Sequence, residues 1–480
     1  EYLQIYCHLQ AICSHLTWAI ENLLHDGFIN QTFDVYEAFP LWHILCTFIS
    51  QATGLTVIPA RIMFLVNGFI YGFLIIVIYL IASKFFNIKI ALLSSLFLCF
   101  NTEALFYGMY SIPRSVIFFL EALFILLLFY EKTIIYKFLC IIIIIGLIMY
   151  HTASMPFIIF ILTLFYIMQM IYRINKNERI INFGYILLIL IMTLTYWMFA
   201  GVKVFNSVIG SLFEKASDVV LTKSIVITPL SELFNYLQYS PLLLFIIIGV
   251  MWGIHSSWLN ESSKAFLLLS LFLVPVTLPG PALLINKLAG NFNLARFGEY
   301  TFLFISIAGA VGIYTLFYYL KKFKVFVILL FFIMGFLIVL NDFTASDNPL
   351  VKRPFYTYYF NEEEIVSINR AAKIANGYLM SDYICCRYLE NTEFADKVHV
   401  LEVGQDQKKL LKSKYNDIIL IREKELLKRP VKLFTSPNDK FVFEPSLSDT
   451  LDYYYNDSIV WDSLNHCNQI YDSGSIKLYQ

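Results

Sequence analysis

The sequence predicts an α-helical polytopic membrane bundle of about 10 to 11 spans, followed by a soluble α/β domain. Hydrophobic residues make up 59% of the chain and charged residues only 15%, whereas soluble domains carry about 25% charged residues. Residues 138–172 contain no Asp, Glu, Lys or Arg, although one span needs only roughly 20 such residues. After Asn341 the composition changes to alternating charged, polar and short apolar stretches, which is typical of a soluble domain.

Hydropathy indicates a series of apolar segments between residues 39 and 341. We expect the first of them, 41–58, to be a re-entrant or interfacial helix, because polar side chains such as His43, Gln51 and Thr53 suit a protein cavity better than lipid. The remaining segments are the expected spans: 61–82, 90–108, 115–130, 135–150, 155–172, 181–201, 241–255, 265–285, 300–320 and 325–341.

The distribution of Lys and Arg predicts the orientation. Short loops rich in these residues face the cytoplasm, and three such loops share one side if every segment between them spans; they lie near residues 84–89, 173–179 and 321–324. We therefore expect an extracytoplasmic first loop at 1–38, a multi-span transmembrane domain at 39–341 and an extracytoplasmic α/β domain at 342–480. No signal-peptide pattern opens the chain, and we expect at least one further span upstream of residue 1.

The C-terminal residues show both helical and strand patterns. "NEEEIVSINRAAKIA" has acids in its first turn and helical apolar spacing, which predicts a helix. "YLMSDYICC", "VHVLEV", "DIILIR" and "FVFE" are rich in β-branched and aromatic residues and predict strands. "IYDSGSIKLY" predicts a terminal hairpin that turns at Ser473 and Gly474. The net charge of the whole chain is zero, which argues against nucleic-acid binding.

Several short patches carry a family resemblance. The first loop ends in "YEAFPLWHIL" and is followed by "TGL", "NLARFGEY" precedes a late span, and "NQIYDSGSIKLY" closes the chain. The chain thereby resembles the C-type (GT-C) membrane glycosyltransferases, especially archaeal members related to dolichyl-phosphate-mannose protein mannosyltransferases and oligosaccharyltransferases. The residues that carry the likeness in the first loop and the segment after it are Tyr36, Phe39, Pro40, His43, Thr53, Gly54 and Leu55.

The resemblance implies sugar transfer in the cell envelope, from a polyprenyl-phosphate-linked donor to a protein or glycan acceptor at the extracytoplasmic face. It also implies that an acidic residue of the first outer loop acts as general base or metal ligand. A divalent metal such as Mg or Mn would neutralise the phosphate leaving group. Which residues would bind this metal is unknown, because no metal-binding spacing of His and Asp is present.

The acid that the family places at the end of its first span has no clear counterpart here. Glu1 is the only acid in "EYLQIYCHLQ", so the catalytic acid is Glu1, lies upstream of residue 1 or is lost. Asp34 and Glu37 are the other candidates in the first loop, and both are also readily explained as solvated charges near the lipid headgroups.

Two arginines are candidates for binding the donor phosphate. A guanidinium holds phosphate oxygens in a bidentate fork and keeps its charge. Arg296 lies in "NFNLARFGEYTF", where the family has a phosphate-binding Arg, and Arg114 lies in "YSIPRS". The alternative for each is an interfacial arginine whose charge reaches the headgroups.

Four further residues are candidates for binding substrate: Tyr36, His43, His151 and Tyr300. A packing role is the alternative for His43, and a helix-capping role for His151. Glu121 lies inside an expected span, where an acidic group costs roughly 2.5–3.5 kcal/mol. It must therefore face the bundle, either in a site or as a structural contact.

Two other functions are compatible with these patterns. A transporter or flippase for lipid-linked saccharides would use broken helices, and "VPVTLPGPAL" contains three prolines and a glycine, but no matching second segment is present. A non-catalytic relative that binds glycolipid is the other alternative, because the first-loop acid is uncertain.

Overall fold

The structure, a computed structural model, describes the chain in part. The described residues are 14–27, 29, 37–54, 59–101, 104, 108, 112–130, 133–151, 154–206, 237, 239–277, 298–339, 360, 362–389, 392–404, 410, 417–428, 432–436, 450–454 and 458–480. Glu1, Asp34, Tyr36 and Arg296 lie outside them. The chain forms two compact units, one built on residues 19–223 and 233–344 and the other mainly on residues 345–480.

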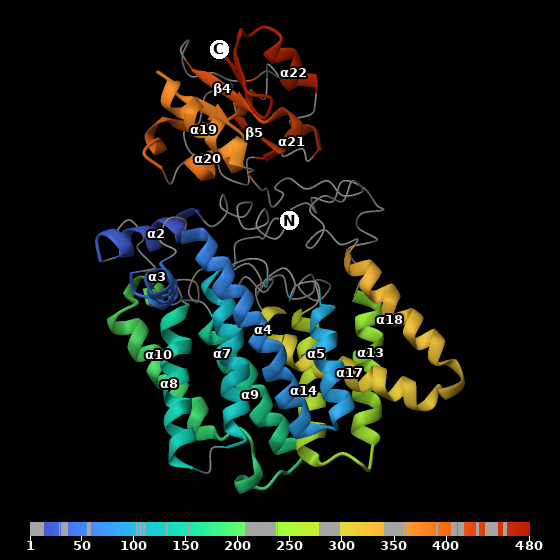
Figure 1. Ribbon diagram of the computed structural model, residues 1–480. Coiled ribbons are helices and arrows are strands. Elements are labelled where there is room, and N and C mark those ends of the chain that lie inside the picture. Colours follow the sequence, from blue (N-terminus) through green and yellow to red (C-terminus); the bar gives the residue numbers. More distant parts are fainter. Residues whose placement is uncertain are drawn as a thin grey trace. The chain divides into compact units, whose positions relative to one another are not determined.

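The first unit is a bundle of helices (Figure 1). Its helices are α2 (Ser14–His25), α3 (Leu41–Thr53), α4 (Pro59–Phe85), α5 (Ile88–Cys99), α7 (Pro113–Leu128), α8 (Ile134–Tyr150), α9 (Met155–Ile171), α10 (Phe183–Phe199), α13 (Tyr239–His255), α14 (Glu261–Thr277), α17 (Gly298–Tyr319) and α18 (Lys324–Val339). Each apolar segment that the sequence predicts as a span thus contains a helix.

Local sequence signals fix where several helices begin. Asn87 caps α5 by accepting a hydrogen bond from the Ile90 amide at 3.0 Å. Asn260 caps α14 in the same way, accepting from the Ser263 amide at 2.8 Å. Pro113 occupies the first turn of α7, where its missing N–H costs nothing. These caps lie at the polar ends of long apolar segments, so the same residues end the loops and start the helices.

Helix α17 is the centre of the bundle. Every residue from Gly298 to Ile313 is buried, and α4, α5, α7, α13, α14 and α18 all contact this helix. Its closest neighbour is α13, because Gly249 and Gly312 face each other at the crossing. A Cβ on Gly312 would overlap the carbonyl oxygen of Phe245, and one on Gly249 would overlap that of Ala308. Small residues at a crossing let two membrane helices approach closely.

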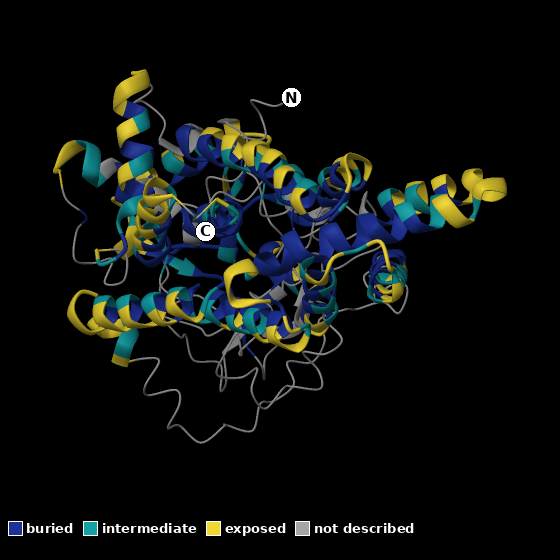
Figure 2. Cartoon of the chain, turned by 90° about the horizontal axis from the view of Figure 1, so that it is seen from below, coloured by how far each residue is buried: buried dark blue, intermediate teal, exposed yellow. Residues whose placement is uncertain are grey.

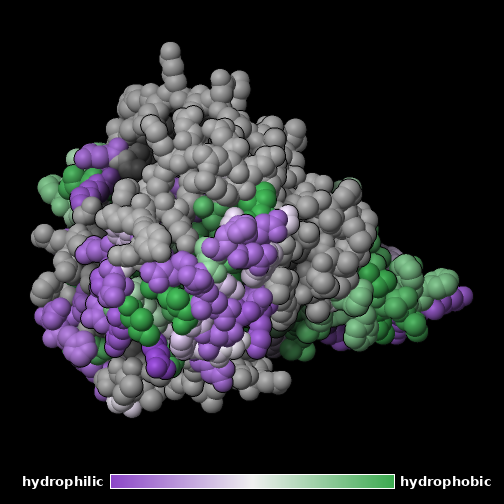
Figure 3. Space-filling view, turned by 90° about the horizontal axis from the view of Figure 1, so that it is seen from above, coloured by the Kyte–Doolittle hydropathy of each residue, from purple (hydrophilic) through white to green (hydrophobic). Residues whose placement is uncertain are grey.

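The outer faces of the bundle are apolar as well. Figure 2 shows the exposed residues along the outer sides of the helices, and many of them are large and hydrophobic. On α8 the side chains of Ile134, Ile135 and Phe138 are 79%, 67% and 62% exposed. The helix at the right of Figure 3, α18, is hydrophobic over much of its surface. A helix that is apolar on all sides belongs in a large core or in lipid.

Helix lengths test the expected spans only in part. Within the described residues, two helices are long and apolar enough to cross a membrane by the usual criteria, Ile62–Phe85 and Gly298–Tyr319. Shorter apolar helices include α8, α9, α10 and α13, with 17 residues each. Such a helix is about 26 Å long, close to the roughly 30 Å of the hydrocarbon core. Membrane association is supported; the number of spans stays a prediction.

Helix α3 is too short to cross. Its 13 residues end at Thr53, and the next residue, Gly54, stops the helix with a φ of 71° in the left-handed conformation. A helix of this length spans about 20 Å. It packs on α4 and α8 and buries His43, as expected for a segment that lies against the bundle.

The second unit is an α/β domain with two sheets. One sheet has the order β2-β1-β4-β8-β7. In it, β2, β1 and β4 are parallel, and β8 is antiparallel to both of its neighbours, β4 and β7. The other sheet has the order β3-β5-β6. The elements are α19 (Glu362–Ile374), β1 (Leu379–Ser381), α20 (Tyr383–Leu389), β2 (Val398–Val400), β3 (Glu402–Gly404), β4 (Ile418–Ile421), α21 (Glu423–Lys428), β5 (Lys432–Ser436), β6 (Thr450–Tyr454), α22 (Ser458–Leu464), β7 (Gln469–Asp472) and β8 (Lys477–Tyr479).

The expected terminal hairpin is confirmed, and one strand is shorter than the sequence predicts. The hairpin is β7 and β8, and Gly474 turns it with a φ of 79°. The predicted strand "YLMSDYICC" ends at Ser381, because Asp382 starts α20 by accepting hydrogen bonds from the amides of Ile384 and Cys385. The predicted strand "FVFE" lies outside the described residues.

A buried ion pair organises this domain. Arg422 follows β4 and Asp382 follows β1, so both lie at the carboxyl ends of neighbouring parallel strands. The guanidinium donates two hydrogen bonds of 2.9 Å to the Asp382 carboxylate and lies 4.6 Å from the Phe360 ring centroid. Both side chains are fully buried, so the pair crosslinks the two strands inside the core.

Candidate functional site

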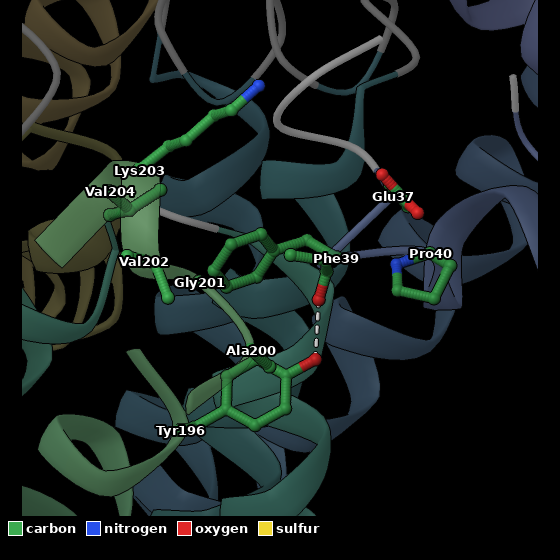
Figure 4. A pocket seen from close by; sticks show the side chains of 10 residues that line it. Glu37, Phe39, Pro40, Tyr196, Ala200, Gly201, Val202, Lys203 and Val204 are labelled. Atoms are coloured by element: carbon green, nitrogen blue, oxygen red, sulfur yellow. Dashed lines mark hydrogen bonds between the residues drawn. The ribbon is translucent and has the colours of Figure 1, made fainter. Parts of the chain in front are cut away.

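A cavity of about 460 Å³ lies where the first loop meets the end of α10 (Figure 4). Its lining is the segment Glu37, Ala38, Phe39 and Pro40 on one side and Tyr196, Ala200, Gly201, Val202, Lys203 and Val204 on the other. The cavity therefore joins the part of the chain that carries the family resemblance to residues about 160 positions away.

Two contacts hold the walls of this cavity together. The Tyr196 hydroxyl donates a hydrogen bond of 2.5 Å to the carbonyl oxygen of Ala38. The Phe39 ring packs edge-on against Tyr196, with centroids 5.6 Å apart. Phe39 is 1% exposed and reaches this position beside Gly201, where an added Cβ would lie 3.1 Å from its ring. The first loop is thus anchored to α10 by one hydrogen bond and one buried ring.

The two walls of the cavity carry side chains of opposite charge. Glu37 contributes an exposed carboxylate, and Lys203 contributes an ammonium group from the short helical segment 202–206 that follows α10. Figure 4 shows the two side chains on either side of the Phe39 ring. A carboxylate can accept a proton from a hydroxyl or amide, and an ammonium group can balance the charge of a phosphate. The cavity therefore offers one group for each end of a transfer reaction.

A second polar cluster is buried inside the bundle. The Arg114 Nε lies 2.7 Å from Glu299 Oε2, with the two side chains 11% and 0% exposed. Glu121, two turns along α7, is 1% exposed and interacts electrostatically with Glu299. Within the described part of the chain, the Glu121 oxygens have no hydrogen-bond partner. Glu121 thus lies near a second carboxylate, Glu299, which is paired with Arg114, and burying a charged carboxylate is costly at such a depth.

Hydrogen bonds extend this cluster to α9. Ser154 Oγ shares a hydrogen bond of 2.5 Å with Tyr300 Oη and one of 2.7 Å with His151 Nδ1. Tyr300 is adjacent to Glu299 in the first turn of α17 and is 1% exposed. The resulting chain of hydroxyl and imidazole groups runs from the buried ion pair to the turn between α8 and α9.

The cavity and the cluster lie at the same end of the bundle. Ser154 precedes α9, and its bond to Tyr300 places the start of α17 beside the start of α9. The Arg114–Glu299 pair places the start of α7 there as well. Helix α10 runs antiparallel to α9, so it ends at this level with Tyr196 and Lys203. Four helix ends therefore bring chemistry to one side of the bundle (Figure 1).

The structure brings together some of the residues predicted from the sequence. Arg114, His151 and Tyr300 belong to the buried cluster, and Glu37 lines the cavity. His43 is fully buried on α3 and is not among the lining residues of the cavity, which favours the packing role. Since Glu1, Asp34, Tyr36 and Arg296 lie outside the described residues, their proposed roles stay predictions.

Three residues of the cavity and the buried cluster were not among the candidates from the sequence. Lys203 and Tyr196 line the cavity, and Ser154 connects His151 to Tyr300. Lys203 could have been noticed, because it is a cation directly after an apolar segment. The roles of Tyr196 and Ser154 depend on contacts across the bundle, for which the local sequence gives no signal.

The described residues do not form a complete metal site. No group of three or more His, Cys, Asp or Glu side chains that could hold a metal ion exists among them. Glu37 is the one carboxylate among the lining residues of the cavity. Magnesium needs six oxygen ligands and takes them from carboxylates, phosphate and water. A metal at Glu37 would therefore depend on ligands beyond the described lining.

Comparison with known proteins gives likeness in structure only. No protein-family model and no curated protein sequence matches the chain. Solved structures of the Archaeoglobus fulgidus oligosaccharyltransferase do match. One is a complex with Zn and sulfate, with 12% sequence identity and a TM-score of 0.47, and the match covers 80% of this chain and 57% of that chain.

Two further structures of the same protein give similar values. One is tethered to an acceptor peptide with the NVT sequon: 11% identity, TM-score 0.48, coverage 80% of this chain and 59% of that chain. The other, named AglB, is in complex with an inhibitory peptide and a dolichol-phosphate. Its sequence identity is 12% and its TM-score 0.48, and the match covers 79% of this chain and 59% of that chain. This chain spans less than three fifths of the length of these proteins. The predicted resemblance to archaeal oligosaccharyltransferases is confirmed as a distant likeness in structure.

Proposed function

We propose that the protein is an integral membrane glycosyltransferase that moves a sugar from a polyprenyl-phosphate-linked donor to an acceptor at the extracytoplasmic face. The observation that carries the proposal is the cavity with Glu37 and Lys203 at one end of an otherwise apolar bundle. A lipid-linked sugar needs apolar surface for its isoprenoid tail and a polar pocket for its phosphate and sugar. The apolar outer faces of the helices and this cavity supply both.

The transfer step assigns one role to each charged residue. Glu37 accepts the proton of the acceptor group while the acceptor atom forms a bond to the anomeric carbon of the sugar. The bond from that carbon to the phosphate oxygen breaks, and the polyprenyl phosphate leaves with the electron pair. Lys203 balances the charge that develops on this phosphate. A divalent metal, if bound beside Glu37, would stabilise the same leaving group.

Arg114 has a more limited role in this proposal than the sequence predicts. Its guanidinium already has a carboxylate partner, Glu299, at 2.7 Å. A donor phosphate would have to share or displace this carboxylate to contact Arg114. We propose Lys203, which lines the cavity together with Glu37, as the phosphate-binding residue among those that the structure describes, with Arg296 as the further candidate from the sequence.

The test is sugar transfer by the purified protein in lipid nanodiscs. Dolichol-phosphate sugars and a sequon peptide are the first donor and acceptor to supply; the archaeal structures hold a dolichol-phosphate and an acceptor peptide with a sequon. Glu37→Gln should lower the rate by about 10²- to 10⁴-fold, the usual contribution of a general base. Lys203→Ala should raise the KM for the donor. The controls are Glu178→Gln and Lys176→Ala, which change exposed charges in the turn between α9 and α10.

Two outcomes would contradict this proposal. Wild-type rates in Glu37→Gln would remove Glu37 as the base and leave Glu1 or Asp34. Donor binding without turnover by the wild type would instead identify a glycolipid-binding protein. Neither result would test whether the chain is embedded in the membrane.

A specific observation also supports transport of a lipid-linked saccharide. Glu121 is a buried carboxylate within α7 beside a second carboxylate, Glu299, and buried acids within membrane helices often carry protons. A flippase would move the intact donor between leaflets in response to a pH gradient, and Glu121→Gln would abolish the movement. An intact sugar–phosphate bond after translocation would favour this function over transfer.

A further inference from the structure

A second cavity, of about 410 Å³, lies at the opposite end of the bundle. It is enclosed by the last turns of α13 and α17 and by the turn before α14. Its lining is Trp252, His255, Ser256, Ser257, Trp258, Tyr314, Tyr318 and Tyr319. Helix α17 starts beside Ser154, at the end of the bundle that carries Glu37 and Lys203. Its last turn therefore lies at the other end, where the loops rich in Lys and Arg lie.

The frame of this cavity is fixed by the glycine crossing. Gly249 and Gly312 hold α13 against α17 at backbone contact, and the lining residues follow within the next turns of each helix. The Trp252 Nε1–H donates a hydrogen bond of 3.3 Å to Tyr319 Oη across the gap. Trp258 packs edge-on against Tyr318, with centroids 6.2 Å apart. The aromatic walls are therefore preformed.

The electrostatics of the cavity suit an anion. Its lining contains no Asp or Glu but carries hydroxyl and indole groups that can donate hydrogen bonds. His255 Nδ1–H donates a hydrogen bond of 2.8 Å to the Met251 carbonyl oxygen, which fixes the ring in the wall of the cavity. Lys321 Nζ lies 5.0 Å from the Tyr318 ring centroid, at the edge of the cavity. The nearby carboxylate of Glu261 is neutralised by Lys264 at 3.1 Å.

The surroundings of the cavity suit a lipid better than a free ion. Trp258 and Tyr319 are 75% and 65% exposed, and such aromatic side chains concentrate at membrane interfaces. Lys321 leads directly into α18, whose outward face is apolar, with Phe332 67% exposed (Figure 3). An acyl chain could lie along this face while its phosphate stays beside Lys321. Basic pockets between helix ends on the cytoplasmic side bind acidic lipid headgroups.

We propose that this cavity binds the headgroup of an anionic phospholipid, with Lys321 contacting the phosphate and the Trp and Tyr side chains holding the glycerol region. The inference rests on the membrane placement in the proposed function, but not on sugar transfer. Lipid binding and transfer activity can therefore fail separately.

The experiment measures lipid binding by the whole protein. The purified protein in detergent is titrated with phosphatidylglycerol or with phosphatidylcholine, and binding is followed by native mass spectrometry and by the shift in thermal unfolding. Glycerol phosphate and inorganic phosphate are titrated in parallel, which separates a lipid from a free anion. The variants are Lys321→Ala and Lys321→Arg, and the matched control is Lys176→Ala in the turn between α9 and α10.

We expect phosphatidylglycerol to bind in preference to phosphatidylcholine. Lys321→Ala should weaken this binding about fivefold, as for one cation near an acidic headgroup, and Lys176→Ala should leave it unchanged. Lys321→Arg should preserve binding. Equal binding of the two lipids, or equal loss in Lys321→Ala and Lys176→Ala, would overturn the proposal. Binding of glycerol phosphate as tight as that of the lipid would identify a soluble-anion site instead.

Discussion

Arg114 Nε and Glu299 Oε2 lie 2.7 Å apart and join the first turn of α7 to the first turn of α17 inside the bundle. Removing one partner of a buried pair leaves an uncompensated charge and typically costs roughly 3–5 kcal/mol. We therefore expect Arg114→Met and Glu299→Gln each to lower the unfolding temperature strongly. The double variant should lose less than the sum of the two, as measured by thermal unfolding in detergent.

The partly exposed pair Lys264–Glu261 provides the control for the Arg114 and Glu299 variants. It joins two positions of the same helix at 3.1 Å, with side chains 16% and 54% exposed. Such pairs contribute about 0–1 kcal/mol, so Lys264→Ala should hardly change the unfolding temperature. Additive losses in the Arg114 and Glu299 variants would show that the two side chains act independently.

The glycine crossing predicts a steep effect of side-chain size. At Gly312 even a methyl group would overlap the Phe245 carbonyl oxygen, so Gly312→Val must force α13 and α17 apart. We expect at least about 1–3 kcal/mol of destabilisation, the usual cost of overpacking. Gly68→Val on α4 has open space around it and serves as the control. Crosslinking between cysteines placed on α13 and α17 would report the separation directly.

The hydrogen bond from Tyr196 is expected to position the wall of the cavity that carries Glu37. Tyr196→Phe keeps the ring that packs on Phe39 but removes the donor to the Ala38 carbonyl. Loss of such a bond costs about 0.5–1.5 kcal/mol, so the protein should stay folded. We expect a lower kcat with little change in unfolding temperature, because Glu37 is adjacent to Ala38. Unchanged kinetics would mean that the first loop needs no anchor on α10.

The predicted orientation can be tested by labelling single cysteines in intact cells. In a background without native cysteines, His466→Cys places an exposed thiol on the C-terminal domain, and Lys176→Cys places one in the turn between α9 and α10. We expect a membrane-impermeant maleimide to label position 466 at once and position 176 only after permeabilisation. The reverse order would invert the topology and move the cavity with Glu37 to the cytoplasmic side.

His399 predicts an acid sensitivity of the C-terminal domain. Burial lowers the pKa of this imidazole, although Asp417 opposes the shift. A base with a lowered pKa in the folded state stabilises the fold when it is neutral. This contribution is complete above the unfolded pKa of about 6.5 and is lost as the pH falls through the lower folded value.

We therefore expect strand β2, which contains His399, and its partner β1 to open more readily at about pH 5 than at about pH 7.5. Hydrogen exchange, corrected for intrinsic rates, measures this opening. His399→Gln should reduce the pH dependence, whereas a change at the exposed His466 should not. The same pH dependence in His399→Gln and in the wild type would assign the effect to another group.

The positions of the helices could be predicted because apolar runs report burial locally. The segments expected at 135–150, 155–172 and 241–255 correspond to α8, α9 and α13 almost residue for residue. Caps set some boundaries that hydropathy did not, as at Asp382, whose carboxylate starts α20 where a strand was expected to continue.

The candidate site could be predicted only as a set of residue types. Arg114, His151 and Tyr300 were selected for their chemistry, and the structure brings them into one cluster. The contacts that join them, Arg114 with Glu299 and Ser154 with Tyr300, link segments that are distant in the sequence. Such pairs depend on which helix faces meet, and periodicity within one segment does not encode that. The same limit hid Tyr196, which acts through the backbone of Ala38.

The central position of α17 determines the order in which the protein can be assembled. Synthesis proceeds from the N-terminus, so α4, α5, α7, α13 and α14 are all made before the helix on which they pack. Until residue 319 has left the ribosome, the faces of these helices that pack on α17 lack that partner. We expect chains truncated before Gly298 to be degraded rather than to persist as partial bundles, and the nascent protein to depend on insertion factors that shield these faces.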